Sequence, residues 1–145
     1  MKPLGGLLAA GAVLAAGQAA RAQKPSAPAA TLSNVPYTVV EQSGRQRVVL
    51  ISPKYRSVAL LRRLGEEFRD AFRSERIVFV IVFDDAKAAR MFDKMFAAGG
   101  SLGREDAFYD KHNVAGYNKN MNSGENLFVI YPYGAGDDRQ IDVKY

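Results

Sequence analysis

The chain has no cysteine and no tryptophan, and it contains a single histidine among its 145 residues. Without cysteine it can have no disulfide framework, no thiol redox chemistry, no lipid-modified cysteine anchor and no cysteine-ligated zinc or iron–sulfur site, because each of these needs the sulfur atom. The one histidine, His112, is the only imidazole available to chemistry that needs a group titrating near neutral pH. Whatever the protein does, it does without thiols.

Long apolar runs are also scarce, and the longest uncharged stretch stands near the start of the chain. Residues 3–20 carry no charge and are mainly Ala, Gly and Leu; Lys2 precedes them, and small residues flank Arg21 just after them. This layout predicts a secretory signal segment, residues 1–22, with cleavage after Ala22 and a secreted or periplasmic protein. An uncleaved membrane anchor is the competing interpretation, but glycines dilute the segment. No later stretch is apolar for long enough to span a bilayer.

The positive charge of the chain is modest. Its Lys and Arg residues number 20 and its Asp and Glu residues 15, for a formal net charge of +5. Lys2 and Arg21 belong to the expected signal segment, so the remainder has 18 basic and 15 acidic residues. Nucleic-acid binding normally needs a concentrated basic face, and we exclude it as a function. No phosphate loop or dinucleotide-binding motif occurs, so no cofactor is expected.

The composition changes again before the folded part begins. Residues 23–34 are mainly Pro, Ala and Ser with almost no bulky apolar side chain, which predicts a flexible linker. The rest of the chain is rich enough in apolar residues for a packed core, since 48% of the whole sequence is apolar. We therefore expect one small folded domain, residues 35–145.

The first half of this domain predicts a hairpin, a helix and a buried strand. Residues 37–41 and 47–51 are rich in β-branched residues and flank Gly44, which suits a tight turn. From residue 57 to 73, apolar residues recur every three or four positions, as on an amphipathic helix. Residues 77–83 are seven apolar residues in a row, which predicts a central strand that is covered on both faces.

A second helix and three more strands complete the predicted fold. The helix runs from Asp84 or Asp85 to about Phe96, with Ala89, Phe92 and either Met95 or Phe96 on its inner side. The strands cover residues 112–119, 126–133 and 140–145. We predict an α/β (α+β) fold, a two-layer sandwich whose mixed β-sheet carries two helices on one face, in the order β-β-α-β-α-β-β-β.

Asp84 and Asp85 directly follow the buried strand. Carboxylates at the carboxyl ends of such strands can bind hard cations or act as acid and base. With His112 they are candidate catalytic residues of a metal-assisted hydrolase, and both aspartates are candidate metal ligands. We favour the competing interpretation, in which one aspartate caps the next helix and His112 is a turn or surface residue, because no hydrolase motif accompanies them.

The segment 117–124 is rich in amides, and its candidate binding residues are Tyr117, Asn118, Asn120 and Asn122. Amides both donate and accept hydrogen bonds, and a tyrosine ring offers a flat apolar face, so such a segment suits sugar hydroxyls or peptide backbone. Asn, Ser and Gly are also the usual residues of turns, and we favour that interpretation.

Tyrosines near the end of the chain are the remaining candidates. Tyr131 and Tyr133 share a face of the strand predicted at 126–133, and they form an aromatic patch with Tyr145 if the last strand pairs alongside. Pro132 cannot donate to a sheet ladder, so this end lies at an edge or past its last pairing. The competing interpretation, again favoured, is that these tyrosines only cover a bare sheet face.

The sequence therefore favours a non-catalytic binding or interaction module, with a glycan, a peptide or a protein as its partner. Two alternatives stay open. One is the metal-assisted hydrolase that uses Asp84, Asp85 and His112. The other is a structural or accessory subunit that pairs with a partner through an exposed edge strand.

Overall fold

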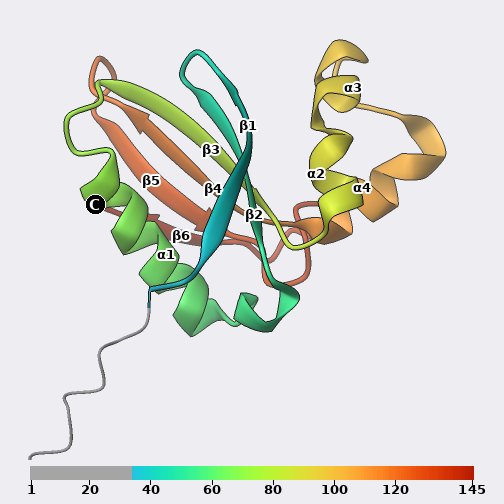
Figure 1. Cartoon of the computed structure of the whole chain (residues 1–145), viewed down its shortest axis with the longest axis horizontal. Helices are drawn as coiled ribbons and strands as arrows, with labels where there is room; N and C mark the ends of the chain where they lie inside the picture. Colours follow the sequence, from blue (N-terminus) through green and yellow to red (C-terminus); the bar gives the residue numbers. More distant parts are fainter. Residues whose placement is uncertain (1–33) are drawn as a thin grey trace, which may run out of the picture. The chain divides into compact units, whose positions relative to one another are not determined.

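One mixed β-sheet organises the part of the chain that the computed structural model describes, residues 34–145 (Figure 1). The predicted signal segment and nearly all of the predicted linker lie outside these residues. The strands follow the chain order across the sheet, and only the pairing of β2 with β3 is parallel. They are β1 (Tyr37–Ser43), β2 (Gln46–Ile51), β3 (Ile77–Phe83), β4 (Asn113–Asn120), β5 (Glu125–Ile130) and β6 (Ile141–Lys144).

Helices connect the strands and pack against the sheet. They are α1 (Val58–Ala71), α2 (Ala86–Arg90), α3 (Phe92–Ala97) and α4 (Asp106–His112), with short 3-10 turns η1 (Pro53–Tyr55) and η2 (Gly103–Glu105). The mixed-sheet α+β sandwich expected from the sequence is confirmed, and so is the order in which strands and helical segments alternate along the chain. Within the described residues no helix is both long and apolar enough to cross a membrane.

The predicted hairpin forms from β1 and β2. Its turn passes through Gly44, whose positive φ of 55° is a conformation that glycine adopts without steric cost. The register shifts between Val39 and Glu41, so that Val40 is an extra residue in β1. Such a bulge disrupts the ladder locally, and here it falls on one of the two edge strands of the sheet.

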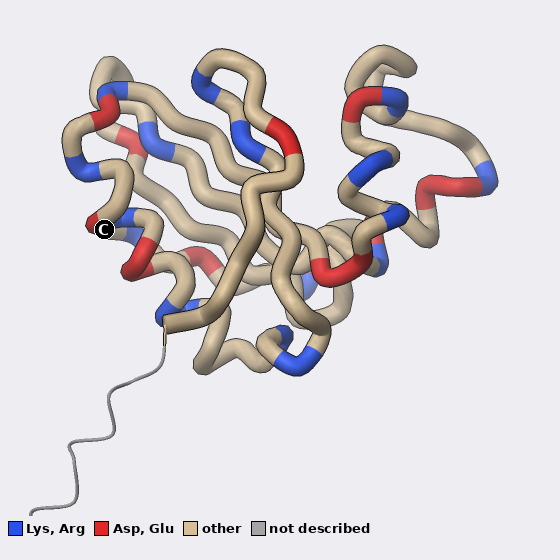
Figure 2. The backbone as a smooth tube through the Cα atoms, viewed as in Figure 1, with Lys and Arg blue, Asp and Glu red and all other residues tan. Residues whose placement is uncertain are grey.

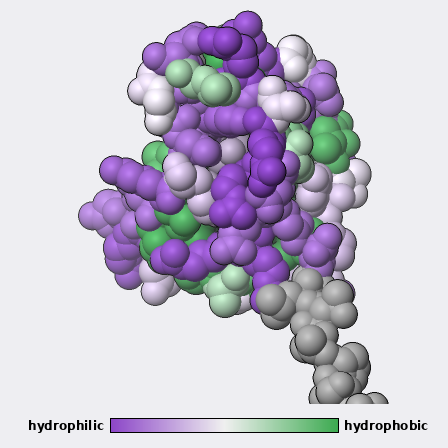
Figure 3. Space-filling model, turned by 90° about the vertical axis from the view of Figure 1, so that its left-hand side faces the viewer, coloured by the Kyte–Doolittle hydropathy of each residue, from purple (hydrophilic) through white to green (hydrophobic). Residues whose placement is uncertain are grey.

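The predicted amphipathic helix is α1, and it covers one face of the sheet. Ser57 caps its start by accepting a hydrogen bond from the Leu60 amide at 3.4 Å. Its inner residues, Leu61, Leu64 and Phe68, are fully buried in the first hydrophobic cluster together with side chains of β2 to β5. The side of the molecule on which α1 lies is mostly hydrophilic at the surface, with apolar groups in small separate areas (Figure 3).

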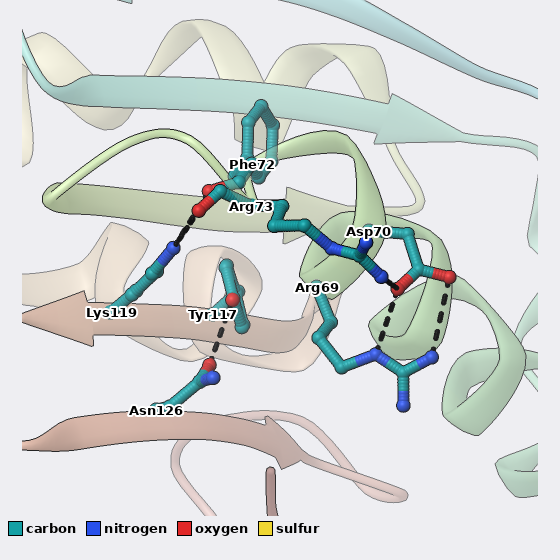
Figure 4. A network of polar contacts seen from close by, with 7 residues as sticks. All are labelled: Arg69, Asp70, Phe72, Arg73, Tyr117, Lys119 and Asn126. Atoms are coloured by element: carbon teal, nitrogen blue, oxygen red, sulfur yellow. Dashed lines mark hydrogen bonds and ion pairs between the residues drawn. The ribbon is translucent and has the colours of Figure 1, made fainter.

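A buried lysine closes the other end of α1. The Nζ atom of Lys119, on β4, donates to the carbonyl oxygens of Phe72 at 2.8 Å and Arg73 at 2.9 Å (Figure 4). The last carbonyls of a helix lack partners inside the helix and carry partial negative charge, so a cation there satisfies them. This contact ties the residues that follow α1 to the end of β4.

The helices occupy both faces of the sheet, which differs from the expectation that both would lie on one. Alternate residues of β3 show this: Val78, Val80 and Val82 belong to the first cluster, whereas Phe83 packs in a second cluster with α2, α3 and α4. In Figure 1 these three helices form a group well apart from α1. They cover only part of the second face, and Phe79 at the start of β3 is 40% exposed.

The segment between β3 and β4 is more helical than the sequence indicates. The predicted second helix breaks at Met91 into α2 and α3, and of the two residues considered for its inner side Met95 is buried and Phe96 is exposed. The helix α4 was not expected from the sequence, and His112 ends this helix instead of starting a strand. The predicted strand 126–133 ends at Ile130, so Pro132 lies past the last pairing.

The close approach of α1 to the sheet gives a testable prediction at Gly65. A Cβ atom there would lie 2.7 Å from Cγ of Phe128 and 2.6 Å from the Tyr145 hydroxyl. We expect Gly65→Ala to lower the free energy of unfolding by about 1–3 kcal/mol through overpacking, although alanine favours a helix by about 1 kcal/mol. Urea unfolding measures the difference.

Gly116→Ala is the matched control. Its new Cβ would meet nothing closer than 3.7 Å, which is an ordinary contact distance, and its φ is not positive. The control should unfold within about 1 kcal/mol of the wild type. Equal stability of Gly65→Ala and the wild type would contradict the close packing described here.

Candidate functional site

Asp84 stands at the carboxyl end of β3, and its side chain is only 3% exposed. Its Oδ2 atom accepts a hydrogen bond from Nη1 of Arg56 at 3.0 Å, and its Oδ1 atom lies 2.7 Å from Nδ1 of His112. A buried carboxylate needs such partners, because leaving it unpaired costs several kcal/mol, on the order of 3–5. The structure thus joins two of the predicted candidates, Asp84 and His112, which are 28 residues apart.

Two hydrogen bonds to carbonyl oxygens at the end of α4 also hold Asp84 and Arg56 in place. The Asp84 amide donates to the His112 carbonyl at 3.1 Å, and Nη2 of Arg56 donates to the Lys111 carbonyl at 3.0 Å. Arg56 follows the turn η1 after β2, and His112 is the last residue of α4. The network therefore ties the ends of the parallel strands β2 and β3 to the end of α4.

The imidazole of His112 is held through its Nδ1 atom, which contacts Asp84. Its ring packs against Phe108 with the centroids 4.6 Å apart. A carboxylate on Nδ1 favours the tautomer in which Nε2 is an acceptor, which is how a histidine is prepared as a base or a metal ligand. The arrangement can do acid–base chemistry, and it can equally serve structure alone.

Asp85 has a different role from its neighbour. It caps α2, since its Oδ1 atom accepts hydrogen bonds from the amides of Lys87 at 2.8 Å and Ala88 at 3.1 Å. The amide of Ala88 contributes most to holding the pKa of Asp85 below its usual value. Within residues 34–145 no group of three His, Asp or Glu side chains lies close enough together to hold a metal ion.

The predicted binding residue Tyr117 lies in the core rather than on the surface. It is 2% exposed and packs under α1, where its hydroxyl donates to Oδ1 of Asn126 at 2.8 Å (Figure 4). Burial is the main cause that raises the pKa of Tyr117. A ligand at the surface therefore cannot reach its ring without opening the core.

The three predicted asparagines divide between a turn and a sheet face. Oδ1 of Asn120 accepts from the Asn122 amide at 3.0 Å, and Oδ1 of Asn122 accepts from Nη2 of Arg76 at 3.3 Å, so both side chains build the β4–β5 turn. Asn118 lies on β4 on the face opposite Tyr117, where it lines a groove. Only Asn118 of the three adjoins a hollow on the second face of the sheet.

The tyrosines at the end of the chain do not form one patch. Tyr145 packs on the α1 side of the sheet, with the Arg69 guanidinium 5.3 Å from its ring centre. Tyr131 lies on the opposite side and lines the same groove as Asn118. Tyr133 is 59% exposed, and the Arg139 guanidinium sits 3.9 Å from its ring centre. Tyr131 and Tyr133 were predicted to share a face of one strand, but β5 ends at Ile130, before both residues.

This groove on the second sheet face was missed by sequence reasoning. It has a volume of about 650 Å³ between the open face of β3, β4 and β5 and the helix α3. Its apolar side chains are Phe79, Ile81, Leu127 and Val129 on the sheet, with Phe92 and Phe96 on α3. The only signal in the sequence was that the strand 77–83 is apolar on both faces. This pattern does not show how much of the strand the helices cover.

Comparisons with known proteins add no assignment. No family model matches the chain, and neither the curated proteins nor the solved structures yield a significant match.

The Asp84 network gives a second prediction. We expect His112→Ala to lower the free energy of unfolding by about 1–3 kcal/mol, because a buried carboxylate oxygen loses its partner. The control is Lys111→Ala, which removes an exposed side chain but keeps the carbonyl that Arg56 binds; it should stay within about 0.5 kcal/mol of the wild type. Equal losses in the two variants would show that the imidazole contributes nothing to stability.

Proposed function

We propose that this domain is an interaction module that binds apolar side chains of a protein partner in the groove between the sheet and α3. The observation that carries the proposal is the exposure of aromatic residues around one hollow. Phe79 is 40% exposed and Phe96 is 73% exposed, and both line the groove. Exposed apolar groups that gather at one hollow are a usual mark of an interaction surface.

The energetics favour an occupant of this surface. Burying a large apolar side chain contributes roughly 1.5–3 kcal/mol, and the groove lacks such cover along three neighbouring strands. On the first face, by contrast, α1 buries the corresponding residues of β3 completely. A partner that covers Phe79 and Phe96 would supply on the second face what α1 supplies on the first.

The lining also indicates the chemistry of the partner. The groove has no Lys, Arg or Asp in its wall, and its polar side chains are those of Gln46, Asn118, Glu125 and Tyr131. Of these, Asn118 lies within the apolar floor, because it pairs with Phe79 on β3 and with Leu127 on β5. A glycan would need several polar groups that converge on its hydroxyls, which this floor does not offer. Aromatic or branched aliphatic side chains of a protein fit it best.

An uncharged dye tests the groove directly. Phenylnaphthylamine fluoresces more strongly in apolar surroundings, and we expect it to bind the chain at low protein concentration. Phe79→Ser should weaken dye binding about tenfold, the equivalent of about 1.4 kcal/mol of lost apolar contact. Fluorescence titration measures the affinity.

Tyr133→Ser is the matched control, because Tyr133 is an exposed aromatic residue that does not line the groove. It should bind the dye like the wild type. Dye binding that is the same in all three proteins would contradict the proposal.

The edge-strand alternative has less support. The sheet ends at β1 and β6. The bulge at Val40 interrupts the ladder of β1, and β6 has four residues. Bulges and short strands are features by which proteins discourage pairing at a sheet edge.

A second candidate function is supported by the contact of Asp84 with His112. It is an acid–base or metal-assisted hydrolytic site beside a hollow of about 410 Å³ at the ends of β2 and β3, which Asp84, Asp85 and Ser52 line and His112 does not. Both Asp84 oxygens already have partners, which is why this candidate ranks second.

Zinc alone distinguishes the two candidates. For the second candidate, zinc raises the unfolding midpoint of the wild type by several degrees, and the rise disappears in His112→Ala. A midpoint that zinc does not move, or a rise that persists in the variant, removes the metal-assisted form of this candidate.

For the location, we propose that the module is secreted or periplasmic. The support is the pattern of residues 1–22, a positive start, a short apolar centre and small residues around Arg21.

A further inference from the structure

The groove has a projecting aromatic ring at its rim. Phe96 is 73% exposed, whereas Phe92, one turn earlier on α3, is 8% exposed and packs in the second hydrophobic cluster. The two rings stack with their centroids 6.2 Å apart and their planes at 26°. Because Phe92 is anchored and backs the outer ring, Phe96 is held in place as a projection beside the hollow.

A projection and a hollow on one face make that face complementary to itself. In a two-fold dimer the same surface meets its own copy, so each projection can enter the hollow of the other chain. The floor of the groove is formed by Phe79, Ile81 and the glycine at position 116, and its volume of about 650 Å³ has room for an aromatic side chain. Phe96 is the right kind of occupant for such a floor.

The charges next to Phe96 are complementary in the same way. Asp93 and Lys94 are exposed neighbours on α3, where Figure 2 shows one acidic and one basic residue side by side, and neither joins an ion pair within residues 34–145. Asp93 is the main cause that raises the pKa of Glu41, so the two carboxyl groups, from α3 and β1, are neighbours. Two carboxyl groups together call for a cation, and Lys94 of a second copy can supply it.

We propose that the groove is filled by a second copy of this chain. The two copies pack α3 against α3 about a two-fold axis, each places Phe96 in the groove of the other, and Lys94 of each approaches the carboxylates of Asp93 and Glu41 of the other. This inference rests on the proposed function, because it names the protein partner of the same groove. The site is incomplete in one chain alone, since its apolar occupant comes from the other.

Sedimentation velocity of the 145-residue chain over a range of concentrations tests the dimer. The wild type should sediment as a dimer at high concentration. Phe96→Ser should raise the dimer dissociation constant at least about tenfold, as expected for an aromatic residue at the centre of an interface. Tyr133→Ser, the matched exposed aromatic residue outside the groove, should dimerise like the wild type.

A charge exchange tests the pairing on α3. Lys94→Asp places like charges together and should weaken the dimer, whereas the double variant Asp93→Lys/Lys94→Asp exchanges the two charges on α3 and should recover part of the lost affinity, because Glu41 stays acidic. A wild type that is monomeric at every concentration, or a Phe96→Ser variant that dimerises as well as the wild type, overturns the proposal.

The dye separates failure of this inference from failure of the proposed function. A monomeric wild type that binds phenylnaphthylamine, with binding lost in Phe79→Ser, overturns the dimer and leaves the groove as a site for another protein. Absence of both dimer and dye binding overturns both proposals. In a dimer of the proposed kind, the dye affinity falls as the protein concentration rises, because the second copy occupies the groove.

Discussion

The need to cover β3 on both faces governs the arrangement of the described domain. This strand is apolar along its whole length and lies inside the sheet between β2 and β4. One face is covered completely by α1, whose inner residues meet Val78 and Val80. The other face receives α2, α3 and α4 only over part of its length, so that Phe83 is buried and Phe79 is exposed. The groove is the consequence of that incomplete second layer.

The buried carboxylate of Asp84 explains why the second layer sits where it does. By binding Arg56 and His112 it joins the ends of β2 and β3 to the end of α4. Asp85 then starts α2 in the next residue through its contacts with the helix amides. Two adjacent aspartates therefore anchor the helical segment at one end of the sheet, and the opposite end of the same face stays open.

Among the candidate residues, sequence reasoning was most informative where chemistry is local. A helix cap depends on neighbouring residues, so a cap at Asp84 or Asp85 could be predicted, and the structure assigns it to Asp85. The turn roles of Asn120 and Asn122 depend equally on near neighbours. Tyr117, in contrast, is in the core because β4 presents that face to α1, and no local pattern reveals which face of a strand a distant helix covers.

By itself, the sequence determined the sheet-and-helix class, the order of strands and helical segments along the chain, the hairpin at Gly44 and the amphipathic face of α1, because periodicity and turn chemistry act over a few residues. Only the tertiary structure decided that the helices lie on both faces and that His112 meets Asp84. It also decided that Phe79 and Phe96 border one groove. Contacts between residues far apart in the chain depend on how the layers pack, and the apolar pattern of β3 is the same whether or not a helix covers it.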